Sequence, residues 1–136
     1  MNVILSIKPE YCRKIKNGNK RYEFRKRIFK NQDGVHRVFM YATCPVQKIV
    51  GAFTIESVIE GDPESLWERF KDFSGIEKHN FFKYFGSTEK GFAIKIKEVE
   101  AFTPIEPKKV VPDFFPPQSF RYIKNQKWID SLKTSE

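Results

Sequence analysis

The chain has 136 residues, of which 40% are hydrophobic and 15% aromatic, and its 25 Lys and Arg against 17 Asp and Glu give a net charge of +8. This length predicts one domain over residues 1–136, which would bury about two-thirds of the surface that the unfolded chain exposes. No apolar stretch approaches a membrane span and the start turns polar too early for a signal peptide, so we expect an intracellular, cytoplasmic protein with no membrane partner.

The cysteines and histidines do not form a metal-binding pattern. Cys12 and Cys44 have no Cys-x-x-Cys or zinc-ligand spacing, and His36 and His79 lie far apart in the sequence. We therefore expect free thiols, no metal site and no cofactor.

The chain begins with an expected strand followed by a short helix. Asn2–Lys8 is an apolar run that is typical of a buried strand. Pro9 suits the first turn of a helix, and Gly18 suits the left-handed residue that ends one. Helical spacing places Tyr11, Cys12 and Ile15 on one face, so the basic residues of this helix point elsewhere.

The next segment, from Lys20 to Arg27, alternates with the period of a strand. This pattern places Tyr22 and Phe24 on one face, where we expect them in the core. Four charged residues share the opposite face: Arg21, Glu23, Arg25 and Arg27. A turn is expected at Asn31–Gly34.

Two more strands and two helices are expected in the middle of the chain. The strands are Val35–Thr43 and Lys48–Glu60, with Gly51 suited to a bend or bulge. Asp62 suits the N-cap of a helix that starts at Pro63 and ends before Gly75, with Trp67 in the core. A second short helix is expected between residues 76 and 86.

The last third predicts a strand, an irregular segment and a final helix. Gly91–Phe102 alternates with a phase slip that indicates a β-bulge near Lys97–Glu98. The proline-rich segment Phe102–Phe120 predicts an ordered loop, and Ser119 suits the cap of a final helix reaching Leu132. Five or six strands with short inserted helices indicate an α+β fold or a small mixed-strand barrel.

Charge is concentrated in one segment of the chain. From Tyr11 to Lys30 nine Lys and Arg accompany a single acid, Glu23, so this segment carries the whole net charge of +8. A patch of one sign favours polyanionic partners, above all nucleic acid.

Residues Gly18 to Arg25 read Gly-x-Lys-x-x-Glu-x-Arg. With "ILSIKPEY" before them, and with "YATCPVQKIVGAF", "LWERF", "GFAIKI" and "PPQSF" after them, they resemble the ASCH domain family. The resemblance covers nearly the whole chain. It implies a PUA-like mixed β-barrel with a cleft over the motif that binds RNA or another nucleic acid, and it assigns Lys20, Glu23 and Arg25 to the motif's charged positions.

The family also includes an amidohydrolase that acts on an acetylated cytidine with a lysine, a threonine and a glutamate. Lys20 matches the lysine, but Glu23 stands where the threonine hydroxyl is needed, which weighs against that activity here. If the chain is an enzyme, Lys20 and Glu23 are its candidate catalytic residues.

The candidate site combines cations with one carboxylate. Glu23 can hold an arginine or accept from a base amino group, while lysine and arginine bind phosphates. The alternative is a structural Glu23–Arg25 ion pair, worth well under about 1 kcal/mol. The predicted nucleic-acid-binding residues are Lys14, Lys16, Lys20, Arg21, Glu23, Arg25, Lys26 and Arg27. The predicted cleft-lining residues are Lys8, Tyr41, Thr43, Ser119 and Arg121, although Tyr41, Thr43 and Ser119 also suit ordinary structural roles.

Three functions remain open on this sequence. The favoured one is a nucleic-acid-binding module, with RNA preferred over DNA. It would take a single strand, a loop or a displaced base and not a duplex groove, because no recognition helix is evident. The second is a hydrolase acting on a modified nucleoside or on RNA, amidohydrolase-like or ribonuclease-like. The third is a transcription-associated adaptor that binds an acidic protein through the same patch.

Overall fold

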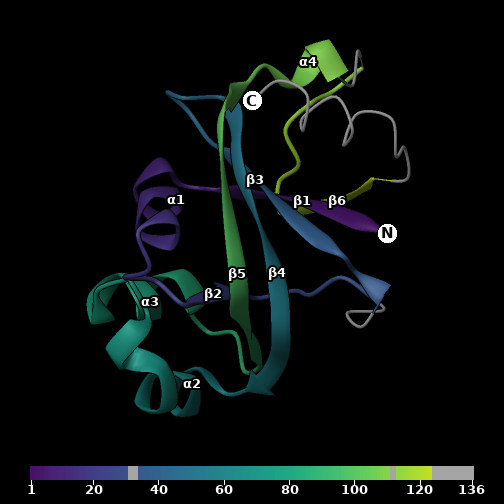
Figure 1. Cartoon of the computed structure of the whole chain (residues 1–136). Helices are drawn as coiled ribbons and strands as arrows, with labels where there is room; N and C mark the ends of the chain where they lie inside the picture. Colours follow the sequence, from purple (N-terminus) through teal and green to yellow (C-terminus); the bar gives the residue numbers. More distant parts are fainter. Residues whose placement is uncertain (31–33, 111–112, 124–136) are drawn as a thin grey trace.

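Six strands form one curled sheet in the computed structural model, which describes residues 1–30, 34–110 and 113–123 (Figure 1). The strands are β1 (Asn2–Ile7), β2 (Tyr22–Arg25), β3 (Arg37–Ala42), β4 (Lys48–Gly61), β5 (Gly91–Ile105) and β6 (Phe120–Ile123). The helices are α1 (Pro9–Lys16), α2 (Pro63–Phe70), the 3₁₀ turn η2 (Lys71–Phe73), α3 (Lys78–Phe85) and α4 (Pro107–Val110). The α+β class, with a curled half-barrel sheet and short inserted helices, is confirmed.

The strand order is β2-β5-β4-β3-β1-β6, so β2 and β6 are the two edges of the sheet. Strand β1 runs parallel to β3 and antiparallel to β6, and the remaining pairs are antiparallel. The long antiparallel pair of β4 and β5, whose connection contains α2 and α3, runs through the middle of the molecule (Figure 1). The two edge strands lie at opposite ends of the hydrogen-bonded order, and Arg25 of β2 contacts Ser119, the residue before β6.

Apolar side chains gather in three clusters. The first lies on the concave side of the sheet and includes Val3, Met40 and Ile94 together with Cys12 and Ile15 of α1. The second lies under α2 and α3 and takes Phe24 from β2, and the third contains Ile4, Phe39, Tyr41 and Phe114. Because Val38 and Met40 join the first cluster whereas Phe39 and Tyr41 join the third, the two faces of β3 serve different cores.

The local signals in the sequence explain where the helices begin and end. Asp62 caps α2 by accepting a hydrogen bond from the Ser65 backbone N–H at 2.9 Å, and Pro63 opens the helix. Gly18 (φ +84°) follows α1, and Gly86 (φ +56°) ends α3. These conformations are ones that glycine adopts without steric cost, so the expected helix ends are confirmed.

The predicted irregularities in the sheet are also found. Ile96 pairs with Ile55 and Val99 pairs with Phe53, so β5 carries one extra residue at Lys97–Glu98, which is the expected bulge. At Gly51 an added Cβ would lie 2.6 Å from the Glu100 carbonyl oxygen, so this position requires glycine. Trp67 is 9% exposed and packs with Phe81, which confirms its core position.

The expected final helix is wrong in its first part. Residues Phe120–Ile123 form β6, which pairs antiparallel with β1. Phe120 packs on Phe29 while Ile123 joins the cluster around Ile4, so alternating side chains serve two opposite faces. The sequence Phe120–Ile123 also fits a period of two, and pairing satisfies the free backbone groups of β1. The rest of the expected helix, including Trp128 and Leu132, lies outside the described residues.

Three smaller expectations also need correction or lie partly outside the described residues. The second strand is shorter than expected, because β2 ends at Arg25 and leaves Lys26 and Arg27 beyond it. The proline-rich segment is less irregular than expected, since β5 continues to Ile105 and α4 follows. Most of the expected turn at 31–34 lies outside the described residues. No helix in the described ranges is long and apolar enough to cross a membrane.

Candidate nucleotide-binding pocket

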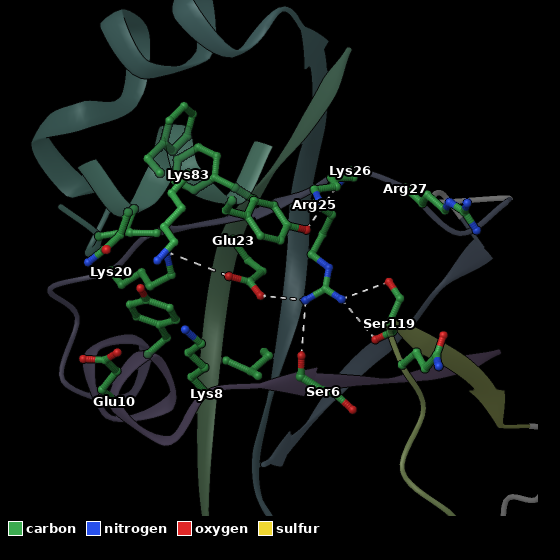
Figure 2. A pocket seen from close by; sticks show the side chains of 18 residues that line it. Ser6, Lys8, Glu10, Lys20, Glu23, Arg25, Lys26, Arg27, Lys83 and Ser119 are labelled. Atoms are coloured by element: carbon green, nitrogen blue, oxygen red, sulfur yellow. Dashed lines mark hydrogen bonds and ion pairs between the residues drawn. The ribbon is translucent and has the colours of Figure 1, made fainter. Parts of the chain in front are cut away.

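The guanidinium group of Arg25 links the two edges of the sheet. From β2 it donates through Nη1 to the Ser6 carbonyl oxygen of β1 at 3.3 Å. Through Nη2 it donates to the carbonyl oxygen and the hydroxyl of Ser119, immediately before β6, at 3.1 and 2.9 Å. Edge strands that do not pair through their backbones are therefore joined by one planar side chain whose fork suits several acceptors at once (Figure 2).

Glu23 lies between Arg25 and Lys20. Its Oε2 accepts from Arg25 Nη1 at 3.2 Å, and its Oε1 lies 3.8 Å from Lys20 Nζ. The three residues are 6%, 8% and 2% exposed, respectively, and form a continuous buried row (Figure 2). Two buried cations share a single carboxylate, so the row keeps a net positive charge that favours an anionic ligand.

A bend before β2 brings Lys20 to this row. The Lys20 backbone N–H donates to Lys14 O at 2.9 Å, and the Arg21 N–H donates to Phe73 O at 2.9 Å. Strand alternation therefore begins only at Tyr22, and Lys20 turns toward Glu23. Its Nζ also donates to Ser74 O at 2.6 Å, and its stem is covered by Gly75, where an added Cβ would lie 2.4 Å from Lys20 Cβ.

Burial lowers the pKa of Lys20 from its ordinary value of 10.5 to about 8. Desolvation of the ammonium group is the main cause, and Lys14 acts in the same direction, whereas Glu23 opposes the shift. The rings of Tyr11 and Phe24 lie 5.2 and 5.0 Å from Lys20 Nζ. This lysine can therefore gain or lose a proton close to neutral pH, unlike a solvated lysine.

The buried row forms part of the wall of a pocket of about 770 Å³, a volume within the range of small-molecule sites. Six cations and two acids line it, an excess of four positive charges. The charged residues are Lys8, Lys20, Arg25, Lys26, Arg27 and Lys83, with Glu10 and Glu23. The pocket is therefore suited to a phosphate-bearing ligand of nucleotide size.

Aromatic and hydroxyl groups complete the wall. Tyr84 of α3 accepts a hydrogen bond from the Lys26 backbone N–H at 3.2 Å, and Lys26 Nζ lies 5.0 Å from its ring centre. Burial raises the pKa of the Tyr84 hydroxyl, so it remains a hydrogen-bond donor at neutral pH. Within the described residues, Nε of Arg25 is buried without a partner. This N–H is therefore free to donate a hydrogen bond to a ligand in the pocket.

Seven of the predicted site residues meet in this pocket. They are Lys8, Lys20, Glu23, Arg25, Lys26, Arg27 and Ser119. Tyr22 and Phe24 pack against the cluster under α2 and α3, as expected, although Phe24 also reaches the pocket wall. The structure thus brings the motif, the strand β1 and the "PPQSF" segment together.

Three predicted cations lie outside the pocket. Arg21 stacks over the exposed ring of Phe73 at 4.4 Å, because the bend before β2 removes it from the face of Glu23. Lys14 donates to Gly75 O at 3.2 Å on the outer side of the bend. Lys16 belongs to the last turn of α1, and its side chain reaches toward Gly51 of β4.

Three predicted cleft residues also lie elsewhere. Tyr41 is 3% exposed and packs on Phe114 in the third cluster, on the face of β3 away from the pocket. Thr43 donates its backbone N–H to Ile7 O and does not line the pocket. Arg121 lies over the ring of Phe115 at 5.2 Å. Strand alternation in β3 and β6 explains why Tyr41 and Arg121 face the other core.

Sequence reasoning missed the contribution of α3. Asn80, Lys83 and Tyr84 all line the pocket, and their spacing of i, i+3 and i+4 places them on one helical face. That stripe was visible in the sequence beside the apolar pair Phe81 and Phe85. Ser6 and Gln118 were also missed, because their positions depend on how β1 and the segment before β6 meet. In the described residues, no three His, Cys, Asp or Glu side chains gather as metal ligands would.

Comparisons with known proteins bear on the fold and on the family. The chain is 30% identical over 126 residues to a Zymomonas mobilis protein named an ASCH domain-containing ribonuclease, covering 90% of this chain and 84% of that one. The crystal structure of ASCH from Zymomonas mobilis matches with a TM-score of 0.89 and 27% identity, over 99% of this chain and 96% of that one. Structures of its tyrosine-to-phenylalanine and serine-to-alanine variants match with TM-scores of 0.89 and 0.90.

A more distant likeness supports the fold alone. The N-terminal domain of Staphylothermus marinus McrB matches with a TM-score of 0.59 at 11% identity, over 99% of this chain and 94% of that one. A sequence model described as the ASCH domain matches residues 5–108, which is most of the chain. The chain therefore belongs to the ASCH domain family.

Proposed function

We propose that this protein binds single-stranded RNA and seats one nucleotide of it in the Lys20–Glu23–Arg25 pocket. The observation that carries the proposal is the buried row itself, in which two cations and one carboxylate line a nucleotide-sized pocket. The rim adds Lys8, Lys26, Arg27 and Lys83, which are exposed and suited to phosphates. The name of the Zymomonas mobilis relative supports RNA as the partner.

A single strand suits the pocket better than a duplex. The pocket lies at the junction of β1, β2 and α3 and is lined by aromatic rings, so an unstacked base can enter it. Glu23, held by Arg25, can accept a hydrogen bond from a base N–H inside the pocket.

Titration of labelled single-stranded RNA at several salt concentrations tests the proposal. If about five phosphates are contacted, log K falls with log[salt] with a slope of several units, at about 0.7 per phosphate for a single strand. Single-stranded DNA and duplex RNA of the same sequence serve as comparisons and are expected to bind more weakly. Binding that is absent, or that does not change with salt, contradicts the proposal.

A second candidate function is RNA cleavage in the same pocket. It is favoured by one observation, the buried Lys20 with its pKa lowered to about 8 beside a carboxylate. Glu23 could take the proton of a ribose 2′-hydroxyl as that oxygen attacks the adjacent phosphorus. Lys20 could then donate a proton to the departing 5′-oxygen, while Arg25 stabilises the charged phosphoryl group.

This chemistry makes a specific prediction about products. Attack by the 2′-hydroxyl forms a 2′,3′-cyclic phosphate on one fragment and leaves a 5′-hydroxyl on the other. Mass spectrometry of the fragments distinguishes them from products of direct hydrolysis. The variant Lys20→Met is expected to abolish cleavage. RNA that stays intact with the wild-type protein leaves binding as the function.

A further inference from the structure

A basic segment beside the pocket is held between two tyrosines. The Lys26 backbone N–H donates to the Tyr84 hydroxyl at 3.2 Å, and the Lys30 backbone N–H donates to the Tyr122 hydroxyl at 2.7 Å. The four Cα–Cα steps between these ends span at most about 15 Å. Both tyrosines remain partly open to solvent, at 37% and 36% exposure. One tyrosine lines the pocket and the other lies beyond it.

The side chains of the segment Lys26–Lys30 point either into the core or into solvent. Phe29 is 1% exposed and packs against Phe120, and Ile28 packs against the first core cluster. Lys26, Arg27 and Lys30 are exposed. Among the described residues none of these three cations takes part in an ion pair. The segment is therefore anchored by its apolar residues and presents unneutralised charge to solvent.

The segment leads away from the buried row. In Figure 2, Lys20, Arg25 and Arg27 follow one another across the view, with Arg27 at the far side of the pocket from Lys20. Arg27 still lines the pocket, whereas Lys30 and Tyr122 do not. Tyr122 is braced from behind by an edge-to-face contact with Phe120, with ring centres 5.7 Å apart. A fixed, exposed ring beside a row of cations is the arrangement by which proteins hold single-stranded nucleic acid.

We propose that Lys26–Lys30 and Tyr122 form a second contact surface for the same RNA strand as it leaves the pocket. Phosphates of the flanking nucleotides lie against Lys26, Arg27 and Lys30, and one flanking base stacks on Tyr122. This inference rests on the proposed RNA binding and makes the ligand an oligonucleotide, since Tyr122 does not line the pocket that holds the first nucleotide.

Two Tyr122 variants test the stacking contact. Tyr122→Leu removes the ring, whereas Tyr122→Phe keeps it and removes only the hydroxyl that accepts from Lys30. For a single-stranded RNA of about twelve nucleotides, we expect Tyr122→Leu to weaken binding about tenfold relative to Tyr122→Phe. A mononucleotide competitor, which fills the pocket alone, is expected to bind both variants equally. Equal affinity of the two variants for the longer RNA overturns the inference.

A matched pair of lysine variants tests the phosphate contacts. Lys30→Gln is expected to reduce the salt slope for the longer RNA by about 0.7, the value of one phosphate contact on a single strand. Lys108→Gln removes an equally exposed lysine of α4, away from the pocket, and is expected to leave the slope unchanged. Equal slopes for the two variants overturn the inference. If the wild-type protein does not bind RNA at all, both the inference and the proposed function are wrong. If it binds RNA and the Tyr122 and Lys30 variants behave as their controls do, only the inference is wrong.

Discussion

The two halves of the basic segment Tyr11–Lys30, residues 11–19 and 20–30, are both basic, with net charges of +3 and +5, but they occupy different places. In the first half, the helical period of α1 turns Cys12 and Ile15 into the core and leaves Arg13 on the outer surface. In the second half, the bend before β2 and the strand period bring Lys20 and Arg25 into the buried row. Exposed charges are screened by salt, while buried ones act in a low dielectric. Local geometry therefore decides which cations form the site, and their number in the sequence does not.

The largest contrast between the halves is expected for Arg25→Leu and Arg13→Leu. Arg25→Leu removes the link between the sheet edges and takes away one of the two cations beside the buried Glu23. Breaking such a buried pair costs about 3 kcal/mol of unfolding free energy, and RNA binding is expected to be lost. Arg13→Leu changes an exposed arginine and is expected to shift stability by less than about 0.5 kcal/mol. Urea unfolding measures both, and similar costs would contradict the role of Arg25.

A smaller contrast is expected between two glycines that both have a positive φ angle. Gly75 (φ +64°) covers the stem of Lys20, whereas an added Cβ at Gly86 (φ +56°) meets nothing within 4 Å. Alanine at either position costs about 1 kcal/mol of stability through backbone strain. Only Gly75→Ala also displaces Lys20, so RNA affinity is expected to fall about tenfold, the size of a lost hydrogen bond to a charged group.

Stability and binding must be measured together for this glycine pair. Thermal unfolding shows whether the two alanine variants are equally strained, and anisotropy titration with RNA shows whether only one has lost affinity. If Gly86→Ala loses as much affinity as Gly75→Ala, the loss comes from general strain, and the position of Lys20 is not the cause.

The pH dependence of RNA binding tests the role of Lys20, the buried lysine of the second half. In the folded protein its ammonium group is charged below pH about 8 and loses its proton above it, whereas in the unfolded chain it stays charged until about 10.5. RNA affinity is therefore expected to fall severalfold between pH 7 and pH 9. Over the same interval the contribution of Lys20 to fold stability rises with pH, because the unfolded state holds more protons. Lys20→Met is expected to bind weakly with no step near pH 8, and a step retained in this variant would assign the titration to another group.

Most of the fold follows from short-range patterns. Asp62 and Pro63 mark the start of α2, and the phase slip after Ile96 marks the bulge in β5. These signals depend on neighbours along the chain, which the sequence displays. The wrong element was Phe120–Ile123, where a four-residue segment fits both periods and long-range pairing with β1 decides for a strand.

The residues of the candidate site were predicted partly from strand alternation and partly from the motif, and neither signal was sufficient alone. Glu23 and Arg25 share a face of β2, as alternation predicts, and Ser119 follows from the position of its motif. Lys20 and Arg21 precede the strand, and hydrogen bonds to Lys14 and Phe73 exchange the faces that alternation assigns to them. Those partners are set by tertiary packing, so the motif marked Lys20 as a site residue, but alternation could not show which way either side chain points.

The smallest expected effects come from replacing single exposed cations. These variants compare the salt dependence of RNA binding between the two halves of the segment. Lys26→Gln and Arg27→Gln remove cations at the pocket rim, while Arg13→Gln and Lys16→Gln remove cations of α1 outside it. Each rim variant is expected to lower the slope of log K against log[salt] by about 0.7, and each α1 variant is expected to leave it unchanged. The slope is the informative quantity, because a cation that only contributes to the distant field changes affinity at low salt without removing a phosphate contact. Equal slopes for rim and α1 variants would mean that RNA lies across both halves of the segment, and the pocket would then be one part of a wider surface.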